Sequence, residues 1–283
     1  MILVTGATGN VGGEVARALS AAGARVRALV RDTSDTPDIP NVLPADVECV
    51  TGDLDDPTCF ATVLRQANGL FLLPGFGHTA ELLAEAAVAG VERVVLLSGP
   101  SAGSGDLTNA VTRSMVESET LVRASGLEWT ILRPSGFMSN ALEWVPQLAA
   151  GDVVRAPFAD VAVACVDPSD IAAVATLALL EDGQGGLVHR LTGPEALRPA
   201  DRLRILAQVL GRDLRFEPQP DDEARAEMAQ EMPAEYVDAF FDFYAAGALD
   251  DSHINNTIRN LTGRAPRSFE QWATAHAEAF PHP

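Results

Sequence analysis

Apolar stretches of strand length alternate with helical patterns along the first half of the chain. Where apolar residues recur at helical spacing, the pattern predicts helices over 11–22, 57–66, 79–89 and 109–124. Strands are predicted at 2–4, 25–30, 47–51, 69–73, 93–97 and 129–133. The run at 93–97 is almost continuously apolar, which is typical of a central strand in a parallel sheet. This alternation predicts an α/β fold with a Rossmann-type, doubly wound parallel sheet.

The pattern changes near residue 137. Strands are predicted at 153–154, 161–166, 188–191 and 214–216, and helices at 171–181, 198–210 and 221–230. We therefore expect a dinucleotide-binding domain over 1–136 and a smaller α/β substrate-binding region over 137–283. Elements near 161–192 are expected to return to the core sheet. The aromatic residues of 236–244 recur at helical spacing, and the pattern leaves core packing and a lid over an apolar substrate both open.

The first predicted strand runs directly into three glycines, and a helical pattern follows at once. Gly6, Gly9 and Gly12 are spaced three apart. Residues without a Cβ let a diphosphate approach the backbone, and the helix N-terminus offers free N–H groups and a positive dipole end. Thr8 has a hydroxyl within reach of a phosphate oxygen, and Asn10 is the expected N-cap. The stretch therefore predicts a dinucleotide-binding turn.

Three segments carry a resemblance to a known family. They are T-G-A-T-G-N-V-G at 5–12, S-G-L-E-W-T-I-L-R-P at 125–134, and the closing segment 261–280. Together they resemble the NmrA-like branch of the atypical short-chain dehydrogenase/reductases. The resemblance implies that Asp53 lies beside the adenine and that the 134–137 turn holds the nicotinamide. The further cofactor contacts that it implies are Val11, Leu54, Leu73, Pro74, Phe76, Ser98, Pro134, Gly136 and Phe137.

The end of the second strand indicates which cofactor is bound. In a dinucleotide fold this position faces the adenosine ribose, where a carboxylate suits the hydroxyl of NAD and an arginine suits the phosphate of NADP. Val30 and Arg31 occupy the place where an acid is expected for NAD. The sequence therefore favours NADP(H) over NAD(H), while Asp32 keeps NAD(H) open.

The usual acid–base pair of the superfamily is missing. All twenty basic residues are arginine, and the two tyrosines, Tyr236 and Tyr244, lie far downstream of the expected helix. Counting from the 125–134 segment, Met115 and Glu119 occupy the positions where the resemblance implies Tyr-x-x-x-Lys. Methionine has no proton to donate, so protonation must come from water, a serine or the substrate itself.

Four polar residues are the candidates for catalysis. Ser98 follows the fifth strand, and the resemblance places its hydroxyl beside a substrate carbonyl or the nicotinamide ribose. The other candidates are Ser101, Glu119 and Asn140. Residues 99–103 also match G-x-S-x-G, the nucleophile elbow of hydrolases, but Gly103 and Gly105 interrupt the helix that such an elbow requires.

Composition excludes several function classes. The formal charge of −19 argues against a nucleic-acid surface. The chain has no uncharged apolar run of 18 residues and no basic leader, so we expect a cytoplasmic protein without a membrane span. Cys49, Cys59 and Cys165 show no metal-binding spacing, so no metal is expected.

These observations predict an NADPH-dependent oxidoreductase that reduces a carbonyl or quinone of an apolar, aromatic or polycyclic small molecule without the Tyr-Lys pair. The alternative is a non-catalytic regulator that senses NAD(P), which the missing acid–base pair supports. The expected partner is a small-molecule substrate, and a homodimer is left open as the assembly.

Overall fold

The computed structural model describes residues 1–31 and 43–281, and the chain divides into two compact units. The first unit holds Met1–Gly105, Ser114–Pro134 and Pro168–Arg190. The second holds Asp106–Arg113, Ser135–Asp167 and Leu191–Pro283. The domain boundary predicted after residue 136 stays a prediction. Among the described residues, every helix is too short or too polar to cross a membrane.

The first unit is built on a seven-stranded sheet, which confirms the predicted Rossmann-type fold. The strand order is β3-β2-β1-β4-β5-β6-β8, and β1 to β6 pair in parallel. All parallel strands end at one edge, so the loops that follow them gather there. The strands are β1 (Ile2–Val4), β2 (Val26–Val30), β3 (Glu48–Thr51), β4 (Gly69–Leu72), β5 (Arg93–Leu97), β6 (Glu128–Pro134) and β8 (Leu187–Leu191).

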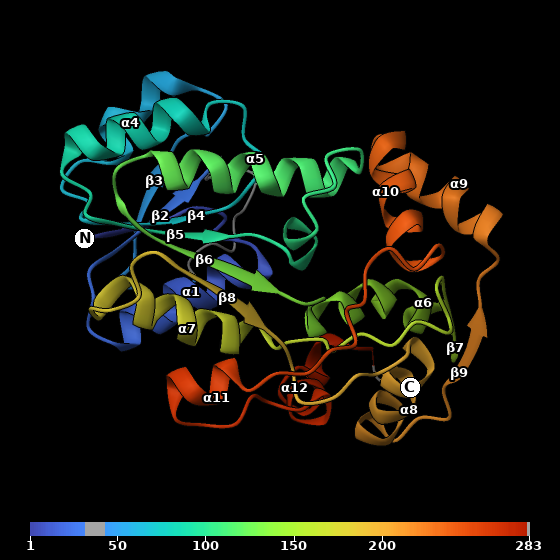
Figure 1. Cartoon of the computed structure of the whole chain (residues 1–283). Helices are drawn as coiled ribbons and strands as arrows, with labels where there is room; N and C mark the ends of the chain where they lie inside the picture. The colour runs from blue at the N-terminus through green and yellow to red at the C-terminus, as the bar shows by residue number, and fades with distance from the viewer. Residues whose placement is uncertain (32–42, 282–283) are drawn as a thin grey trace. The chain divides into compact units, whose positions relative to one another are not determined.

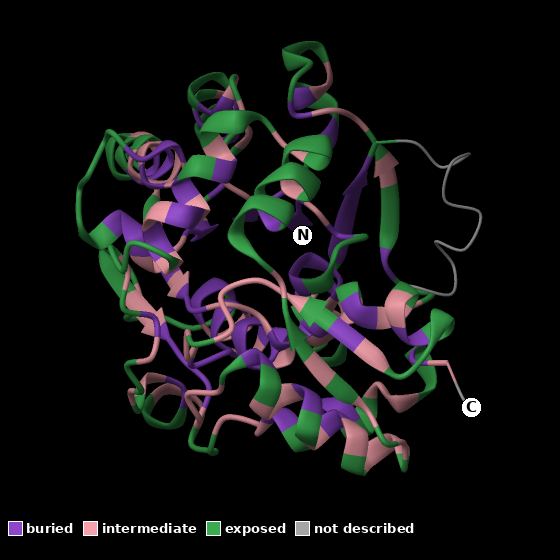
Figure 2. Cartoon of the chain, turned by 90° about the vertical axis from the view of Figure 1, so that its right-hand side faces the viewer, coloured by how far each residue is buried: buried purple, intermediate pink, exposed green. Residues whose placement is uncertain are grey.

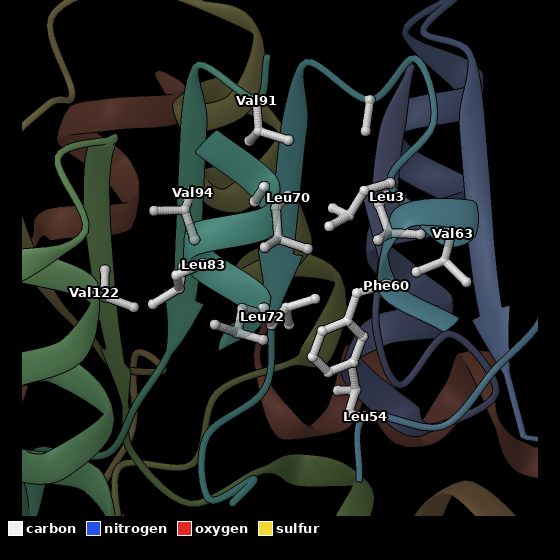
Figure 3. Close-up of a cluster of buried hydrophobic side chains, with 14 of the residues drawn as sticks. Leu3, Leu54, Phe60, Val63, Leu70, Leu72, Leu83, Val91, Val94 and Val122 are labelled. Atoms are coloured by element: carbon white, nitrogen blue, oxygen red, sulfur yellow. The ribbon is translucent and has the colours of Figure 1, made fainter. Parts of the chain in front are cut away.

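Helices cover both faces of this sheet (Figure 1). One face packs against α3 (Phe60–Val63), α4 (Thr79–Ala89) and α5 (Ala110–Ala124), and Figure 3 shows the apolar side chains between them. The other face carries α1 (Asn10–Ala21) and α7 (Pro168–Leu180), which pack against each other. The central strands β1, β2, β4 and β5 are almost wholly buried, whereas β3 and β8 at the two edges of the sheet carry exposed residues (Figure 2).

The helix predicted over 57–66 is shorter than expected. A 3₁₀ turn, η1 (Pro57–Cys59), precedes α3, and Gln66 has a left-handed backbone with φ of 62°. A non-glycine residue in that conformation ends the helical geometry. A second 3₁₀ turn, η2 (Pro100–Gly103), follows β5.

The second unit has its own apolar core. Met138, Trp144, Leu203, Phe269 and Trp272 are buried within it. A two-stranded parallel sheet joins β7 (Val153–Ala156) to β9 (Arg215–Pro218). The remaining elements are η3 (Met138–Trp144), α6 (Val145–Ala150), α8 (Pro199–Leu210), α9 (Asp221–Glu231), α10 (Ala234–Tyr244), α11 (Thr257–Thr262), α12 (Phe269–Ala275) and η4 (Ala277–Ala279).

The strand predicted over 161–166 is wrong, because this segment forms only isolated bridges, Val163 with Leu197 and Val166 with Phe137. Its backbone groups bond to separate segments rather than to one neighbouring strand. The N–H of Ala164 donates to the carbonyl of Asp251, while that of Val166 donates to Gly136. Alternating apolar residues give the period of a strand but do not supply a continuous partner.

The same segment crosses another at a glycine. The Gly193 N–H donates to the Ala164 carbonyl over 3.0 Å. A Cβ placed on Gly193 would lie 1.9 Å from the carbonyl oxygen of Cys165. The two backbones therefore pass too close for any side chain at position 193.

Candidate functional site

Glycine backbone closes the turn after β1. The Gly9 N–H donates to the Gly6 carbonyl over 2.9 Å, and Gly6 has a left-handed φ of 62°. A Cβ on Gly12 would lie 2.1 Å from the Gly6 oxygen, and one on Gly6 would lie 2.3 Å from Leu73 Cδ1. Glycines at positions 6 and 12 are therefore required for this turn.

The helix that follows presents its N-terminus openly. Gly9 is the N-cap with extended backbone, and Asn10 is already helical, so the predicted N-cap role of Asn10 is wrong. No side chain caps the helix and its first turn holds no acid. The N–H groups of the first turn, including those of Asn10, Val11 and Gly12, have no acceptor within the helix. Thr8 is exposed beside them. This geometry fits a diphosphate.

Thr5 is a contributor that sequence reasoning missed. Its buried hydroxyl donates to the Phe71 carbonyl over 3.0 Å and accepts from the Leu73 N–H over 3.0 Å. Thr5 thereby fixes Leu73 against Gly6. In the sequence, Thr5 marks only the end of an apolar run, so nothing local indicates its bridging role.

The segment after β4 is also held in place. The Gly75 N–H donates to the Ser118 hydroxyl over 3.1 Å, and the Phe76 carbonyl accepts from Thr79 over 2.8 Å. The Phe76 side chain packs partly buried against the sheet core. Pro74 lies between these anchors, so three of the predicted cofactor contacts (Leu73, Pro74 and Phe76) share one ordered segment.

Two further predicted contacts follow β2 and β3. Arg31 is exposed directly after β2, while Asp32 lies outside the described residues. After β3, the Asp53 carboxylate accepts from the Asp55 N–H over 3.0 Å, and Leu54 is buried. The adjacent ends of β2 and β3 are thus followed by the Arg31 guanidinium and by the Asp53 carboxylate, which the Asp55 N–H holds in place.

Two catalytic candidates meet in one buried network. Ser98 donates to Glu119 Oε1 over 2.7 Å. Arg133 binds both carboxylate oxygens of Glu119, at 2.8 and 2.7 Å, and Arg123 lies 3.3 Å away. Burial alone raises the pKa of Glu119, but hydrogen bonds from Arg133 and Ser98 outweigh it and hold that pKa below its usual value. Glu119 is therefore an ionised acceptor.

Met115 lies beside Gly99, the residue that follows Ser98. Met115 Sδ is 3.9 Å from where a Cβ on Gly99 would lie. Ser101 is buried within η2, a 3₁₀ turn. The serine of a nucleophile elbow begins an α-helix, so η2 does not fit that motif.

The 134–137 turn is anchored by an aspartate from far along the chain. The Gly136 N–H donates to Asp251 Oδ2 over 3.0 Å. The Gly136 carbonyl accepts from Val166, whose own carbonyl accepts from Met138. Asp251 was missed because it is 115 positions away in the sequence. The predicted contacts Pro134, Gly136 and Phe137 thus form a fixed turn.

Asn140 and the aromatic residues of 236–244 differ in how far they are buried. Asn140 is exposed in η3, and its side chain forms no hydrogen bond with the described part of the chain. In α10, Phe241 and Phe243 are buried, and Phe241 lies 5.0 Å from the Phe158 ring. Phe241 and Phe243 therefore pack within the second unit.

No group of metal-ligating side chains occurs among residues 1–31 and 43–281.

The comparisons with known proteins agree on a family. The NmrA-like family model matches residues 1–273.

The chain belongs to the NmrA-like family.

It is 41% identical over 99% of both chains to a (4-alkanoyl-5-oxo-2,5-dihydrofuran-3-yl)methyl phosphate reductase of Streptomyces griseus. It is 32% identical over 99% of both chains to an NAD(P)H azoreductase of Xenophilus azovorans. A solved NADPH-dependent quinone oxidoreductase from Escherichia coli superposes with a TM-score of 0.76 at 22% identity, covering 97% of this chain and 99% of that one. The prediction of an NAD(P)H-dependent reductase of the atypical short-chain type is confirmed.

Proposed function

We propose that the protein is an NADPH-dependent reductase of a conjugated small molecule, either a quinone or a carbonyl compound with an apolar body. The observation that carries this proposal is the pairing of an intact diphosphate turn with a helix that holds Met115 and an ionised Glu119. Gly6, Gly9 and Gly12 would hold the diphosphate, and NADPH supplies a hydride when bound. Neither Met115 nor Glu119 donates a proton.

The substrate class follows from the missing acid. Hydride addition to an isolated ketone creates a strongly basic alkoxide, which needs a nearby acid. Addition to a quinone or a doubly activated C=C bond creates a delocalised anion that water protonates. The names of the two relatives describe a conjugated lactone with an alkanoyl group and azo compounds, which are electron-poor double bonds of this kind.

The network at Ser98 has a positioning role in this proposal. Because Ser98 directs its hydrogen at Glu119 Oε1, its oxygen is left to accept from a ligand. Glu119 and Arg133 hold that orientation. Asn140 and Ser101 remain candidates for contact with the substrate, and the 134–137 turn is proposed to hold the nicotinamide.

NADPH is proposed over NADH because Arg31 follows β2 without a competing interaction among the described residues. A guanidinium matches a phosphate in charge and geometry. Three unpaired thiols fit a reducing compartment such as the cytoplasm. The homodimer stays a prediction.

The test is NADPH oxidation measured with quinones, alkylidene lactones and simple ketones. The proposal expects turnover of the conjugated substrates, at least ten times less with simple ketones, and lower kcat/KM with NADH. Equal turnover of simple ketones would contradict the assigned substrate class. Tight cofactor binding without any turnover would favour the sensing regulator.

A further inference from the structure

The turn that follows β6 has most of its backbone N–H groups already engaged. The N–H groups of Ser135 and Met138 donate to backbone carbonyls of other segments over 2.9 and 3.0 Å. The Gly136 N–H donates instead to a side chain, the carboxylate of Asp251, over 3.0 Å. A backbone carbonyl is present whatever the side chain, whereas the bond to Asp251 depends on the identity of that residue. Asp251 is therefore the partner of this turn that a substitution removes.

The N–H of Phe137 is left without an acceptor among residues 1–31 and 43–281. Phe137 forms a parallel bridge with Val166, whose N–H and carbonyl bond to Gly136 and Met138 on either side of it. In a parallel ladder, the residue between two such bonds directs its own N–H and C=O to the opposite side. The Phe137 N–H thus faces away from Val166 and is able to donate to a ligand.

Asp251 is itself held in place. It is only 3% exposed, and its own carbonyl accepts from the Ala164 N–H over 2.8 Å. Further along the same segment, the Asn255 N–H donates to the buried Thr192 hydroxyl over 3.0 Å. A Cβ placed on Gly136 would lie 3.9 Å from Asp251 Oδ2, which is ordinary van der Waals contact. The carboxylate is therefore fixed against the Gly136 peptide.

This arrangement limits how a carboxamide binds at the turn. The nicotinamide carboxamide has one carbonyl oxygen as acceptor and one NH2 group as donor. A turn with one available N–H gives that oxygen a single partner and so fixes one orientation of the ring. If the Gly136 N–H were also available, the oxygen would have two neighbouring partners and the ring two orientations. By engaging Gly136, Asp251 leaves the Phe137 N–H as the donor.

We propose that Asp251 is a positioning residue that determines which face of the nicotinamide is presented to the substrate. It acts through the Gly136 N–H rather than on the reacting atoms. This inference rests on the proposed function, in which the 134–137 turn holds the nicotinamide, and adds to it the choice of face for hydride transfer.

The first test measures binding without turnover. It compares calorimetric titrations of NADP⁺ and of 2′-phospho-ADP-ribose, which is the same molecule without its nicotinamide. Asp251→Ala is expected to weaken NADP⁺ binding by about 3- to 10-fold, the factor that one hydrogen bond contributes. Binding of 2′-phospho-ADP-ribose should stay within about twofold of wild type, since distant sites act independently. Equal weakening of both ligands overturns the positioning role.

Two variants serve as controls. Asp251→Asn keeps a carbonyl oxygen that accepts from the Gly136 N–H, so it should restore NADP⁺ binding. Asp250 is exposed at the preceding position and accepts from the N–H and hydroxyl of Ser252. Asp250→Ala thus removes the same charge without removing the bond to the turn, and should bind both ligands as wild type does. Asp251→Ser is the second truncation, with the same loss expected, where Asp251→Ala does not fold.

The second test follows the face of hydride transfer. NADPH carrying deuterium at the 4R or the 4S position of the ring is oxidised with 1,4-naphthoquinone, and the deuterium retained in NADP⁺ is measured by mass spectrometry. Wild type should lose the label from one compound and retain it in the other. We expect Asp251→Ala to lower the preference between faces to about tenfold or less, so that about one transfer in ten uses the other face.

A merely structural role lowers the folded fraction without changing the face. Strict face choice in the truncated variants therefore overturns the proposal, while mixed transfer that Asp251→Asn corrects supports it. If wild type reduces no quinone, the proposed function fails, and the titrations still decide the role of Asp251.

Discussion

Glu119 combines a negative charge with two arginines at a position where the resemblance implies a lysine. Arg133 holds both oxygens of its carboxylate, and Ser98 donates to one of them. The side chain of Glu119 is only 6% exposed, so water screens this pair weakly. Removal of one partner from such a pair leaves an uncompensated buried charge.

Glu119→Gln is therefore expected to lower the free energy of unfolding by about 3 kcal/mol at pH 7. Because the folded-state pKa of Glu119 lies below its ordinary value of 4.5, the contribution is present above that pH. It is lost as pH falls through the folded-state pKa. Denaturant unfolding at a series of pH values measures this difference, and a gap between wild type and variant that stays constant from pH 7 to pH 3 contradicts the assignment.

Gly12→Ala tests the diphosphate turn. Its Cβ would meet the Gly6 carbonyl oxygen at 2.1 Å, so the backbone must shift. We expect at least a 100-fold loss of NADPH affinity in a calorimetric titration. Gly13→Ala is the milder comparison, because its Cβ would meet the Ala7 carbonyl oxygen at 3.3 Å, a contact that a shift of a few tenths of an ångström relieves, and alanine favours the helix. Unchanged affinity in Gly12→Ala would remove the turn from the cofactor site.

Residues with a local signature were predictable, while those defined by distant contacts were not. The spacing of Gly6 and Gly12 is enough to predict a turn. Thr5 and Asp251 act through partners that are brought close only by the fold, so no local pattern marks them. The direction of the Ser98 hydrogen likewise depends on Glu119, which is 21 positions away.

At the level of elements, one hydroxyl joins the ends of two central strands. Thr5 at the end of β1 donates to Phe71 in β4 and accepts from Leu73. The position of Leu73 beside Gly6 depends on this link.

Thr5→Val keeps the shape of the side chain and removes both hydrogen bonds. We expect a loss of about 1–3 kcal/mol in unfolding free energy, because the Leu73 N–H and the Phe71 carbonyl lose a partner. NADPH affinity should fall as well. Thr5→Ser retains the hydroxyl and should stay close to wild type in both chemical denaturation and cofactor titration. Equal stability of the Val and Ser variants would show that the link is dispensable.

Helices and strands were predictable from the apolar pattern where the segment packs or pairs along its whole length with one neighbouring element. The strands β4 and β5 and the helix α4 lie where apolar period and length place them. The segment 161–166 has the period of a strand, but its bonds go to Leu197, Asp251 and Gly136 in turn. A sequence pattern reports which residues are buried and leaves open what they pair with.

For the whole molecule, cofactor binding is coupled to stability. A ligand that binds only the folded state raises its stability by about 2.7 kcal/mol at 100 times Kd. We expect NADPH to raise Tm more than NADH does at the same concentration. Arg31→Ala should abolish that difference, since the adenosine phosphate loses its cation.

Arg25→Ala is the control for this thermal shift. It removes the same charge from the other end of β2, where the side chain is also exposed. A difference between NADPH and NADH that survives in Arg31→Ala but disappears in Arg25→Ala would reverse the assignment.

The close crossing at Gly193 fixes how two segments of the second unit pass each other. The carbonyl oxygen of Cys165 occupies the space that the Cβ of any side chain at position 193 would need. The segment on that side continues to Val166, which bonds to Gly136. In a saturation mutagenesis screen, position 193 should therefore tolerate no replacement. A chemist who redesigns substrate range should leave that crossing alone and diversify the side chains around it.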